Sequence, residues 1–181
     1  MNSTRAENSD KIFCELFAVV FSYPVETYKQ SVEQLSELSE KQDIHLPGLE
    51  AFNQLVQNTA LARLEELFTI TFDMNPDTCL ELGWHLYGES YQRGEFLVKM
   101  RQALDAAGVA EEIELPDHLR HCLLLLGKLP DSEAMELAGN IMLPAFKKVQ
   151  TSLSDENLFG GAVMALAEFL NVRYAIIEEV Q

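Results

Sequence analysis

Hydrophobic residues recur every three or four positions along most of the chain and seldom at every second position. A spacing near 3.6 residues is typical of helices that bury one face, whereas strands require alternation. The pattern predicts an all-α protein, a single-domain bundle of about eight or nine helices. We expect residues 1–9 to form a flexible polar N-terminus and residues 10–181 to form the domain. The predicted helices span residues 10–22, 24–40, 47–58, 61–72, 77–87, 90–107, 116–126, 131–148 and 155–179.

Several helix ends are marked by residues with defined capping preferences. Asp10 and Asp131 are predicted N-caps, because a carboxylate accepts hydrogen bonds from the free N–H groups of a first turn. Asn75 followed by Pro76 predicts a helix start, since proline fits the first helical position. Gly108 is a predicted stop, because glycine adopts the left-handed conformation that ends many helices.

The charge of the chain restricts its partners. The sequence has 181 residues, of which 48% are hydrophobic, and it carries 13 Lys and Arg against 29 Asp and Glu, a net charge of −16. This composition supports a folded core and excludes a disordered chain. A field of this sign repels nucleic acid and anionic membranes, whereas it attracts cationic partners. The same acidity is also compatible with a surface that serves solubility.

The cysteines and the polar N-terminus indicate a cytoplasmic protein. Cys14, Cys79 and Cys122 are odd in number and widely separated, a pattern typical of reduced, buried thiols rather than of disulfides. The first ten residues lack the apolar run of a secretory signal, and no stretch approaches the roughly 18 apolar residues that span a bilayer. We therefore expect no membrane insertion.

Aromatic and basic residues interrupt the simple helical pattern in two places. The predicted helix 77–87 has a wide apolar arc that includes Trp84 and Tyr87, so it is either central in the core or contacts a partner on one side. Arg93 and Arg173 lie within apolar faces. A guanidinium in such a position requires a carboxylate partner or a route to solvent, and a structural ion pair is the expectation for both.

The sequence contains few arrangements that suggest catalysis or metal binding. His118, His121 and Cys122 occupy one helical turn and could ligate a soft divalent metal, which leaves a small metal-binding protein as an alternative. Glu81 and His85, four residues apart, form either an acid–base pair or a solvated helix-face contact. Nucleotide-binding motifs are absent, and we predict no catalytic residues.

One group of motifs resembles the NarJ family, the nitrate reductase delta-subunit-like assembly chaperones that are related to the TorD and DmsD redox enzyme maturation proteins. The resemblance is strongest over residues 66–126. The motifs are Phe72-Asp73, Cys79-Leu80-x-Leu82, His85-Leu86-Tyr87-Gly88-Glu89, Arg93-Gly94 and Glu114-Leu115-Pro116-Asp117-His118-Leu119.

This resemblance implies a TorD-like, non-catalytic cytoplasmic chaperone, a monomer or weak dimer. It would bind the N-terminal or leader region of a molybdoenzyme catalytic subunit until molybdopterin guanine dinucleotide is inserted, before membrane attachment or export. The cofactor would belong to the client and would not be bound stably by the chaperone. The partner-binding residues implied by the motifs are Trp84, Tyr87, Gly88, Arg93, Glu114, Pro116, Asp117 and His118.

A groove lined by Trp84 and the tyrosines would hold a basic or amphipathic peptide, with His118 exposed beside it. On this expectation, alanine at both Asp117 and His118 weakens peptide binding without unfolding the protein. The chain departs from the family in its Phe68–Thr71 segment, which lacks a tyrosine, and in ending at Gln181 without a longer tail. These departures leave another dimethyl-sulfoxide-reductase-class enzyme open as the client. A generic helical adaptor protein remains the alternative.

Overall fold

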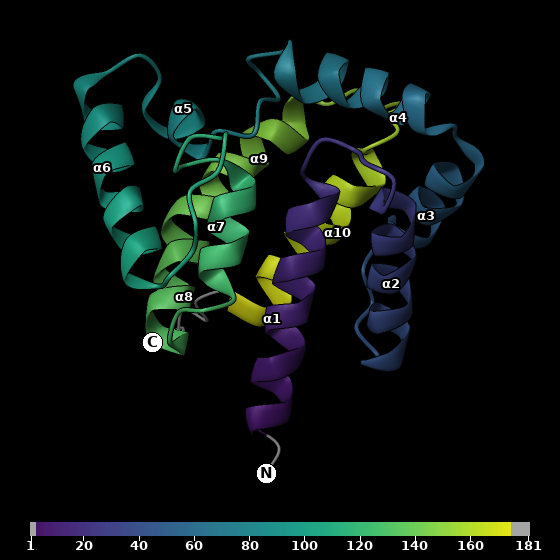
Figure 1. The fold of residues 1–181 in the computed structure, drawn as a ribbon, viewed down its shortest axis with the longest axis horizontal. Helices are drawn as coiled ribbons and strands as arrows, with labels where there is room; N and C mark the ends of the chain where they lie inside the picture. Colours follow the sequence, from purple (N-terminus) through teal and green to yellow (C-terminus); the bar gives the residue numbers. More distant parts are fainter. Residues whose placement is uncertain (1–2, 175–181) are drawn as a thin grey trace, which may run out of the picture.

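The computed structural model describes residues 3–174, with side chains from residue 9 onward. The regular structure of this part of the chain is helical, which confirms the predicted all-α class (Figure 1). An isolated antiparallel bridge between Glu81 and His118 accompanies the helices. The elements are α1 (Ser3–Val20), α2 (Tyr28–Lys41), α3 (Leu49–Asn58), α4 (Leu61–Phe68), η1 (Thr69–Asp73), α5 (Leu82–Tyr87), α6 (Tyr91–Ala106), α7 (Leu119–Leu126), α8 (Asp131–Leu137), η2 (Ala138–Met142), α9 (Leu143–Ser152) and α10 (Gly160–Tyr174).

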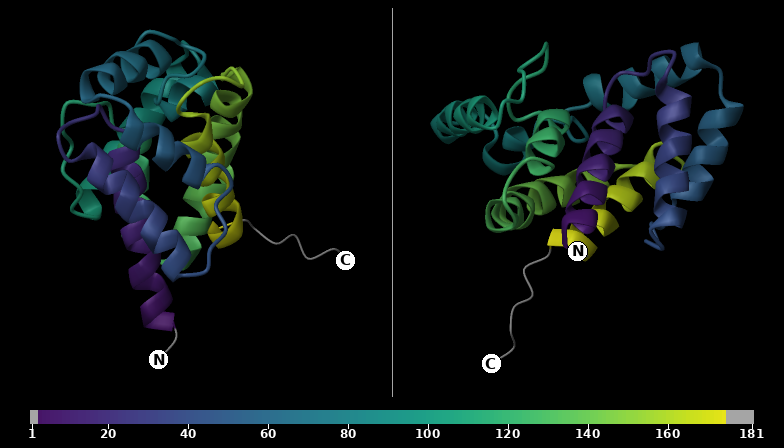
Figure 2. Two further views of the ribbon diagram at one scale, coloured as in Figure 1. Left: turned by 90° about the vertical axis from the view of Figure 1, so that its right-hand side faces the viewer. Right: turned by 60° about the horizontal axis from the view of Figure 1, so that its bottom comes forward.

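Helix α1 occupies the middle of the molecule, with α2 and α3 on one side of it and α5 and α6 on the other (Figures 1 and 2). Phe13, Phe17 and Phe21 follow one another at four-residue spacing on and just after α1, and all three are completely buried. Phe13 and Phe17 pack on Phe169 of α10, with ring centroids 5.0 and 5.5 Å apart. Because aromatic side chains bury large areas, this stripe makes α1 the centre of the core.

The start of α1 differs from the expected N-cap at Asp10, because the helix already begins at Ser3. Asp10 lies inside the helix, where its carboxylate accepts hydrogen bonds of 2.8 and 2.6 Å from Arg173. The Asp10 carboxylate is therefore paired with a guanidinium instead of with the free N–H groups of a first turn. The ion pair predicted for Arg173 is confirmed.

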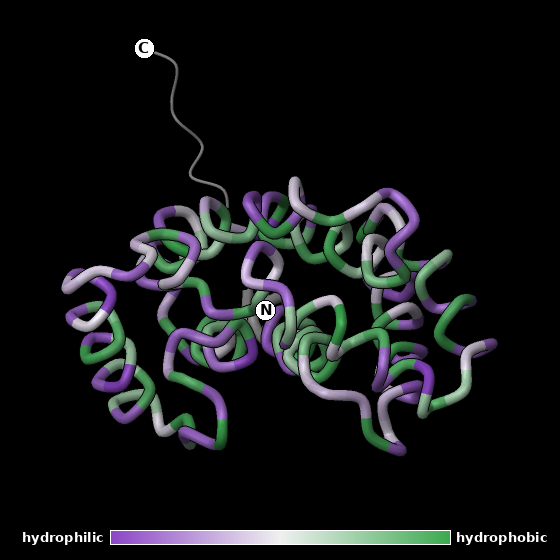
Figure 3. The backbone as a smooth tube through the Cα atoms, turned by 90° about the horizontal axis from the view of Figure 1, so that it is seen from above, coloured by the Kyte–Doolittle hydropathy of each residue, from purple (hydrophilic) through white to green (hydrophobic). Residues whose placement is uncertain are grey.

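Two long helices each contain a π-helical turn. Helix α4 continues through η1, and α8 continues through η2 into α9. The first turn places Phe68 and Phe72 5.0 Å apart between ring centroids, and both rings pack on Phe159. Figure 3 shows hydrophobic and hydrophilic residues alternating along the helices, as expected when each helix buries one side. The predicted helix over 61–72 is therefore confirmed, with a local widening at its end.

Residues 75–81 do not form the predicted start of a helix at Asn75. The Asn75 side chain accepts a hydrogen bond of 3.1 Å from the Asp77 N–H, which closes a turn instead. The backbone then runs beside the start of α7: the Leu119 N–H donates to the Leu80 carbonyl at 2.8 Å, and the Leu82 N–H donates to the Asp117 carbonyl at 3.0 Å. We call this pairing the bridge. It uses backbone groups that a helix would need, so α5 begins at Leu82.

The other helix ends agree with the sequence pattern only in part. Gly108 has φ of +61° and ends α6 as predicted, whereas α7 begins at Leu119 rather than at Pro116. The last predicted helix starts later, at Gly160, and its predicted final residues 175–179 lie outside the described part of the chain. Within residues 3–174, none of the helices combines the length and apolar character needed to cross a membrane.

Candidate functional site

A groove of about 800 Å³ opens where four segments that are distant in sequence meet. These segments are the end of α1 with its link to α2, the end of α4 with η1, the residue before α5, and the link from α6 into α7. In Figure 1 this region lies at the top of α1 and α7. We call it the acidic groove; its lining residues are Val19, Ser22, Tyr23, Val25, Thr27, Phe68, Asp73, Glu81, Glu112, Ile113, Glu114, His118 and Arg120.

The acidic groove carries an excess of negative charge. Four of its lining residues are carboxylates, and Glu112 is the one paired with Arg120, at 2.9 Å. Burial together with the nearby charges of Glu81 and Asp73 raises the pKa of Glu114. The part of this rise that comes from Glu81 and Asp73 reflects repulsion between the carboxylates, and a cation placed among them would relieve that repulsion. The groove is thus suited to Lys or Arg side chains.

Apolar side chains line the same groove and continue beyond it. Tyr23 and Val25, on the link between α1 and α2, are 52% and 48% exposed although they are large and apolar. A smaller neighbouring hollow shares Tyr23 and is also lined by Ile70 and Met74, both exposed. Exposed apolar side chains that gather around one concavity are typical of a binding surface. Together with the carboxylates, they fit a partner that is both basic and amphipathic.

The side chain of Asp117 is completely buried and does not line the acidic groove. Its carboxylate Oδ2 accepts a hydrogen bond of 3.0 Å from the Gly83 N–H at the start of α5. Burial raises the pKa of Asp117, while the Arg93 charge and the Gly83 N–H act in the opposite direction. Asp117 therefore caps α5 from a different segment of the chain and, with the buried Pro116, presents no surface to a partner.

Arg93 and Trp84 are half-buried, and Arg93 connects Trp84 to the buried Asp117. The Arg93 Nε lies 3.9 Å from the Asp117 Oδ2, and the guanidinium lies over the Trp84 ring, 5.5 Å from its centroid. The Trp84 Nε1 donates to the Pro76 carbonyl at 3.0 Å. The expected ion pair of Arg93 is confirmed. Trp84 does not line the acidic groove, whose aromatic lining residues are Tyr23 and Phe68. Its role in partner binding stays a prediction.

Tyr87 and Gly88 lie at the turn between α5 and α6, away from the acidic groove. The Tyr87 ring packs on Phe96 of α6, with centroids 5.4 Å apart, and the side chain is 37% exposed. Gly88 ends α5 with φ of +59°, a conformation that favours glycine. Of the eight residues that the motifs implied as partner-binding, Glu114 and His118 are the ones that line the groove.

The sequence suggested that His118 is exposed, but its side chain is buried, with 6% of its surface accessible, and it lines the groove. Its Nδ1 accepts a hydrogen bond of 3.2 Å from the Arg120 N–H and so caps α7. Because Nδ1 accepts this bond, the neutral ring carries its proton on Nε2, and protonation of Nδ1 would remove the cap. Burial, aided by the charges of His121 and Arg120, lowers the pKa of His118 to about 3. The imidazole is therefore neutral at physiological pH.

The buried His118 makes the free energy of unfolding depend on pH. Below about pH 6.5 the unfolded chain gains a proton at His118 that the folded protein does not, so the free energy of unfolding falls. Between about pH 7 and about pH 5, we expect His118 alone to remove about 2 kcal/mol. Urea titrations of the native protein and of His118→Asn, whose amide keeps an N-cap acceptor, should differ by this amount. Equal pH dependence in the two proteins would contradict the assignment.

The histidine and cysteine spacing considered for a metal serves hydrogen bonding instead. The His121 Nδ1 donates to the Leu115 carbonyl at 2.9 Å, and its Nε2 accepts from the Glu112 N–H at 3.4 Å. The Cys122 thiol is buried and donates to the Asp117 carbonyl at 3.6 Å. In the described part of the chain, no group of three or more His, Cys, Asp or Glu residues is arranged to hold a metal ion. All three cysteines are free thiols; Cys14 and Cys122 are buried, as predicted, whereas Cys79 is half-buried.

Glu81 and His85 do not form the helix-face pair considered from their spacing. Glu81 precedes α5 and lines the acidic groove, whereas His85 is buried, with its Nε2 2.7 Å from the Cys79 carbonyl oxygen. Because α5 begins at Leu82, Glu81 lies outside the helix that contains His85.

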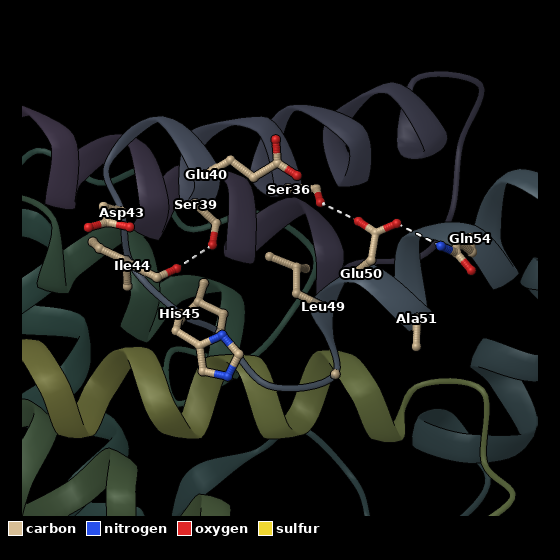
Figure 4. Close-up of a pocket in the computed structure, with 12 residues that line it drawn as sticks. Ser36, Ser39, Glu40, Asp43, Ile44, His45, Leu49, Glu50, Ala51 and Gln54 are labelled. Carbon is tan, nitrogen blue, oxygen red and sulfur yellow. Dashed lines mark hydrogen bonds between the residues drawn. The ribbon is translucent and has the colours of Figure 1, made fainter.

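A second hollow of about 640 Å³ lies between α2 and α3 (Figure 4). It also contains carboxylates, including Glu40 and Glu50. Glu50 accepts hydrogen bonds from Ser36 and Gln54, and the Ser39 hydroxyl donates to the Ile44 carbonyl at 2.6 Å. The bond between Ser36 and Glu50 joins the two helices, and none of the motif residues lines this hollow.

The apolar residues around the acidic groove carry no signal in the helical pattern of the sequence. Tyr23, Val25 and Ile113 lie in links between helices, outside any periodic pattern. Their position in the chain could have indicated a binding surface, because a large apolar residue in a short polar link does not belong to the buried face of a helix. Their meeting at one groove depends on the fold.

Comparisons with known proteins identify relatives. The family model described as nitrate reductase delta subunit matches residues 28–159. The nitrate reductase molybdenum cofactor assembly chaperones NarJ of Escherichia coli K12 and O157:H7 are each 36% identical over 99 residues, 53% of this chain and 40% of theirs. The matched region thus spans less than half the length of these curated relatives.

A solved structure shares the fold. The crystal structure of a candidate redox enzyme maturation protein from Archaeoglobus fulgidus aligns with a TM-score of 0.63 and 21% sequence identity. The alignment covers 89% of this chain and 93% of the other. At this identity the likeness concerns the helical architecture.

Proposed function

The chain belongs to the nitrate reductase delta subunit family, as its motifs predicted, and on this premise we propose that it is an assembly chaperone for a molybdoenzyme. The chaperone binds the N-terminal region of the catalytic subunit in the acidic groove, in the cytoplasm, while the molybdenum cofactor is inserted. Membrane attachment or export of the client follows release. The NarJ proteins of Escherichia coli, which are similar over 99 residues, carry the name of such chaperones.

The observation that carries this proposal is the combination of charge and apolar surface in one groove. Asp73, Glu81 and Glu114 attract a basic segment, and exposed Tyr23 and Val25 accept its apolar side chains. Electrostatic attraction speeds the encounter, and burial of apolar surface holds the complex. Transient binding of this kind suits a chaperone that releases its client when the client folds.

The groups in the groove favour binding over bond chemistry. The Ser22 hydroxyl donates to the Ala18 carbonyl at 2.6 Å, and the His118 Nδ1 is engaged as a helix cap. We therefore propose a chaperone without catalytic residues. The carboxylates would also repel the phosphates of molybdopterin guanine dinucleotide, so the cofactor is assigned to the client.

We expect removal of two groove charges to weaken client binding. In Glu81→Gln/Glu114→Gln, the affinity for a peptide containing the first residues of the client should fall about tenfold, because its basic side chains lose their partners. Raising the salt concentration from about 50 mM to about 500 mM should weaken the native complex and affect the variant less. Isothermal titration calorimetry measures both effects.

The client for this experiment is identified by co-purification with the tagged chaperone from its own host, followed by mass spectrometry. Glu136→Gln is the matched control, since Glu136 is exposed on α8, outside the groove. A catalytic subunit that binds equally to all three proteins, or no molybdoenzyme subunit among the bound proteins, would contradict the proposal.

A further inference from the structure

The link between α6 and α7 presents an isoleucine fully to solvent. Ile113 is 99% exposed, the largest fraction among the large hydrophobic residues of the described chain. It lines the acidic groove, with Glu112 and Glu114 on either side in the sequence. A side chain with this exposure adds nothing to the core, so folding does not explain its apolar character.

The backbone that carries Ile113 is fixed at several points. Glu111 accepts hydrogen bonds of 2.8 and 2.6 Å from Arg101 of α6, and Glu112 accepts bonds of 2.9 and 3.0 Å from Arg120 of α7. The completely buried His121 contacts both sides of Ile113, through the Glu112 N–H and the Leu115 carbonyl.

The backbone N–H of Glu112 can only donate, so the His121 Nε2 must be the acceptor and the Nδ1 carries the proton that goes to Leu115. In this tautomer His121 bonds to the link on both sides of Ile113 and so restricts its backbone. A link that is already restricted loses less conformational entropy when it binds a partner.

The charges beside Ile113 are partly neutralised within the protein. Glu111 and Glu112 are paired with arginines, whereas Glu114 faces the charges of Glu81 and Asp73, which contribute to its raised pKa. One apolar side chain and one group of carboxylates without an ion pair in the described part of the chain therefore lie next to each other at the groove. A partner that satisfies both must carry an apolar and a cationic side chain close together.

We propose that Ile113 is an anchoring residue, which packs against an apolar side chain of a basic amphipathic helix while a neighbouring Lys or Arg of that helix reaches Glu114. Val25, 48% exposed in the same groove, supplies a second apolar contact. The occupant follows from charge complementarity and from the apolar exposure around the groove. This inference rests on the proposed function, since it specifies how the groove recognises its client segment.

The test uses a fluorescent peptide of about 16 residues, with leucines on one helical face and lysines on the other, and a scrambled peptide of the same composition. We expect the native protein to bind the amphipathic peptide more tightly than the scrambled one. Ile113→Ser should weaken binding about tenfold, because an apolar contact is lost, whereas Ile113→Leu should stay within about twofold. Single Leu→Ala peptides should couple to Ile113→Ser at one leucine, which a double-mutant cycle measures.

Val98→Ser is the matched control, because Val98 is 53% exposed on α6 and does not line the groove; its affinity should be native. All variants should keep the native melting temperature, since the altered side chains are exposed. Native affinity in Ile113→Ser would overturn the anchoring role and leave the proposed function standing. Failure of the native protein to prefer the amphipathic peptide would overturn both.

Discussion

Replacing Asp117 with alanine is expected to lower the free energy of unfolding by about 3 kcal/mol. The carboxylate is completely buried, accepts a hydrogen bond from the Gly83 N–H and lies 3.9 Å from the Arg93 Nε. Alanine would leave the first turn of α5 without its cap and a largely buried guanidinium without its counter-charge. The loss should be visible as a lower midpoint in urea denaturation followed by circular dichroism.

Two further variants distinguish this network from a general effect of removing charge. Asp117→Asn keeps an oxygen that can accept from Gly83 and should cost less than alanine. Asp155→Ala removes a carboxylate that is exposed between α9 and α10, and should leave stability unchanged. If alanine at position 117 were as harmless as at position 155, the buried network would contribute nothing.

This result would also change how the motif around Asp117 is interpreted. From the sequence, alanine at Asp117 and His118 was expected to weaken partner binding without unfolding the protein. The structure contradicts the second half of that expectation, because both side chains are buried and both cap helices. Loss of chaperone activity in such variants would therefore reflect lost stability as well as lost contact. Substitutions at Glu81, Glu114 and Ile113 examine the groove more directly.

Replacing Gly161 with alanine is expected to lower the free energy of unfolding by about 2–3 kcal/mol. The start of α10 packs against the start of α3 so closely that a Cβ on Gly161 would lie 2.5 Å from the Gly48 carbonyl oxygen and 3.0 Å from the Phe52 Cβ. The obstructing atom belongs to the backbone, so it cannot rotate away. The two helices would have to separate, and Phe52 would lose contacts in the core.

The adjacent Gly160 supplies the matched control. A Cβ built there meets no heavy atom within 4 Å, and the residue lies in the same first turn of α10. Gly160→Ala should therefore be neutral or slightly stabilising, since alanine restricts the unfolded chain more than glycine does. Thermal unfolding of both variants compares them directly, and equal melting temperatures would refute the close packing of α3 and α10.

The sequence by itself determined those features that depend on neighbouring residues. Periodic apolar positions identified the helices, and Gly108 marked the end of α6, because helix faces and caps are local properties. The pairing of Arg173 was also foreseeable, since a guanidinium on an apolar face requires a counter-charge, although its partner Asp10 was not.

The tertiary structure alone decided the site. Tyr23, Asp73, Glu81 and Ile113 are widely separated in the chain, and the packing of α1, α4 and α7 brings them to one groove. In the bridge, the backbone groups of residues 80–82 pair with the segment at the start of α7 instead of forming a helix, and Asp117 is buried. Contacts between distant segments overrode local propensity in these places, because a buried backbone group must find a partner wherever the fold supplies one.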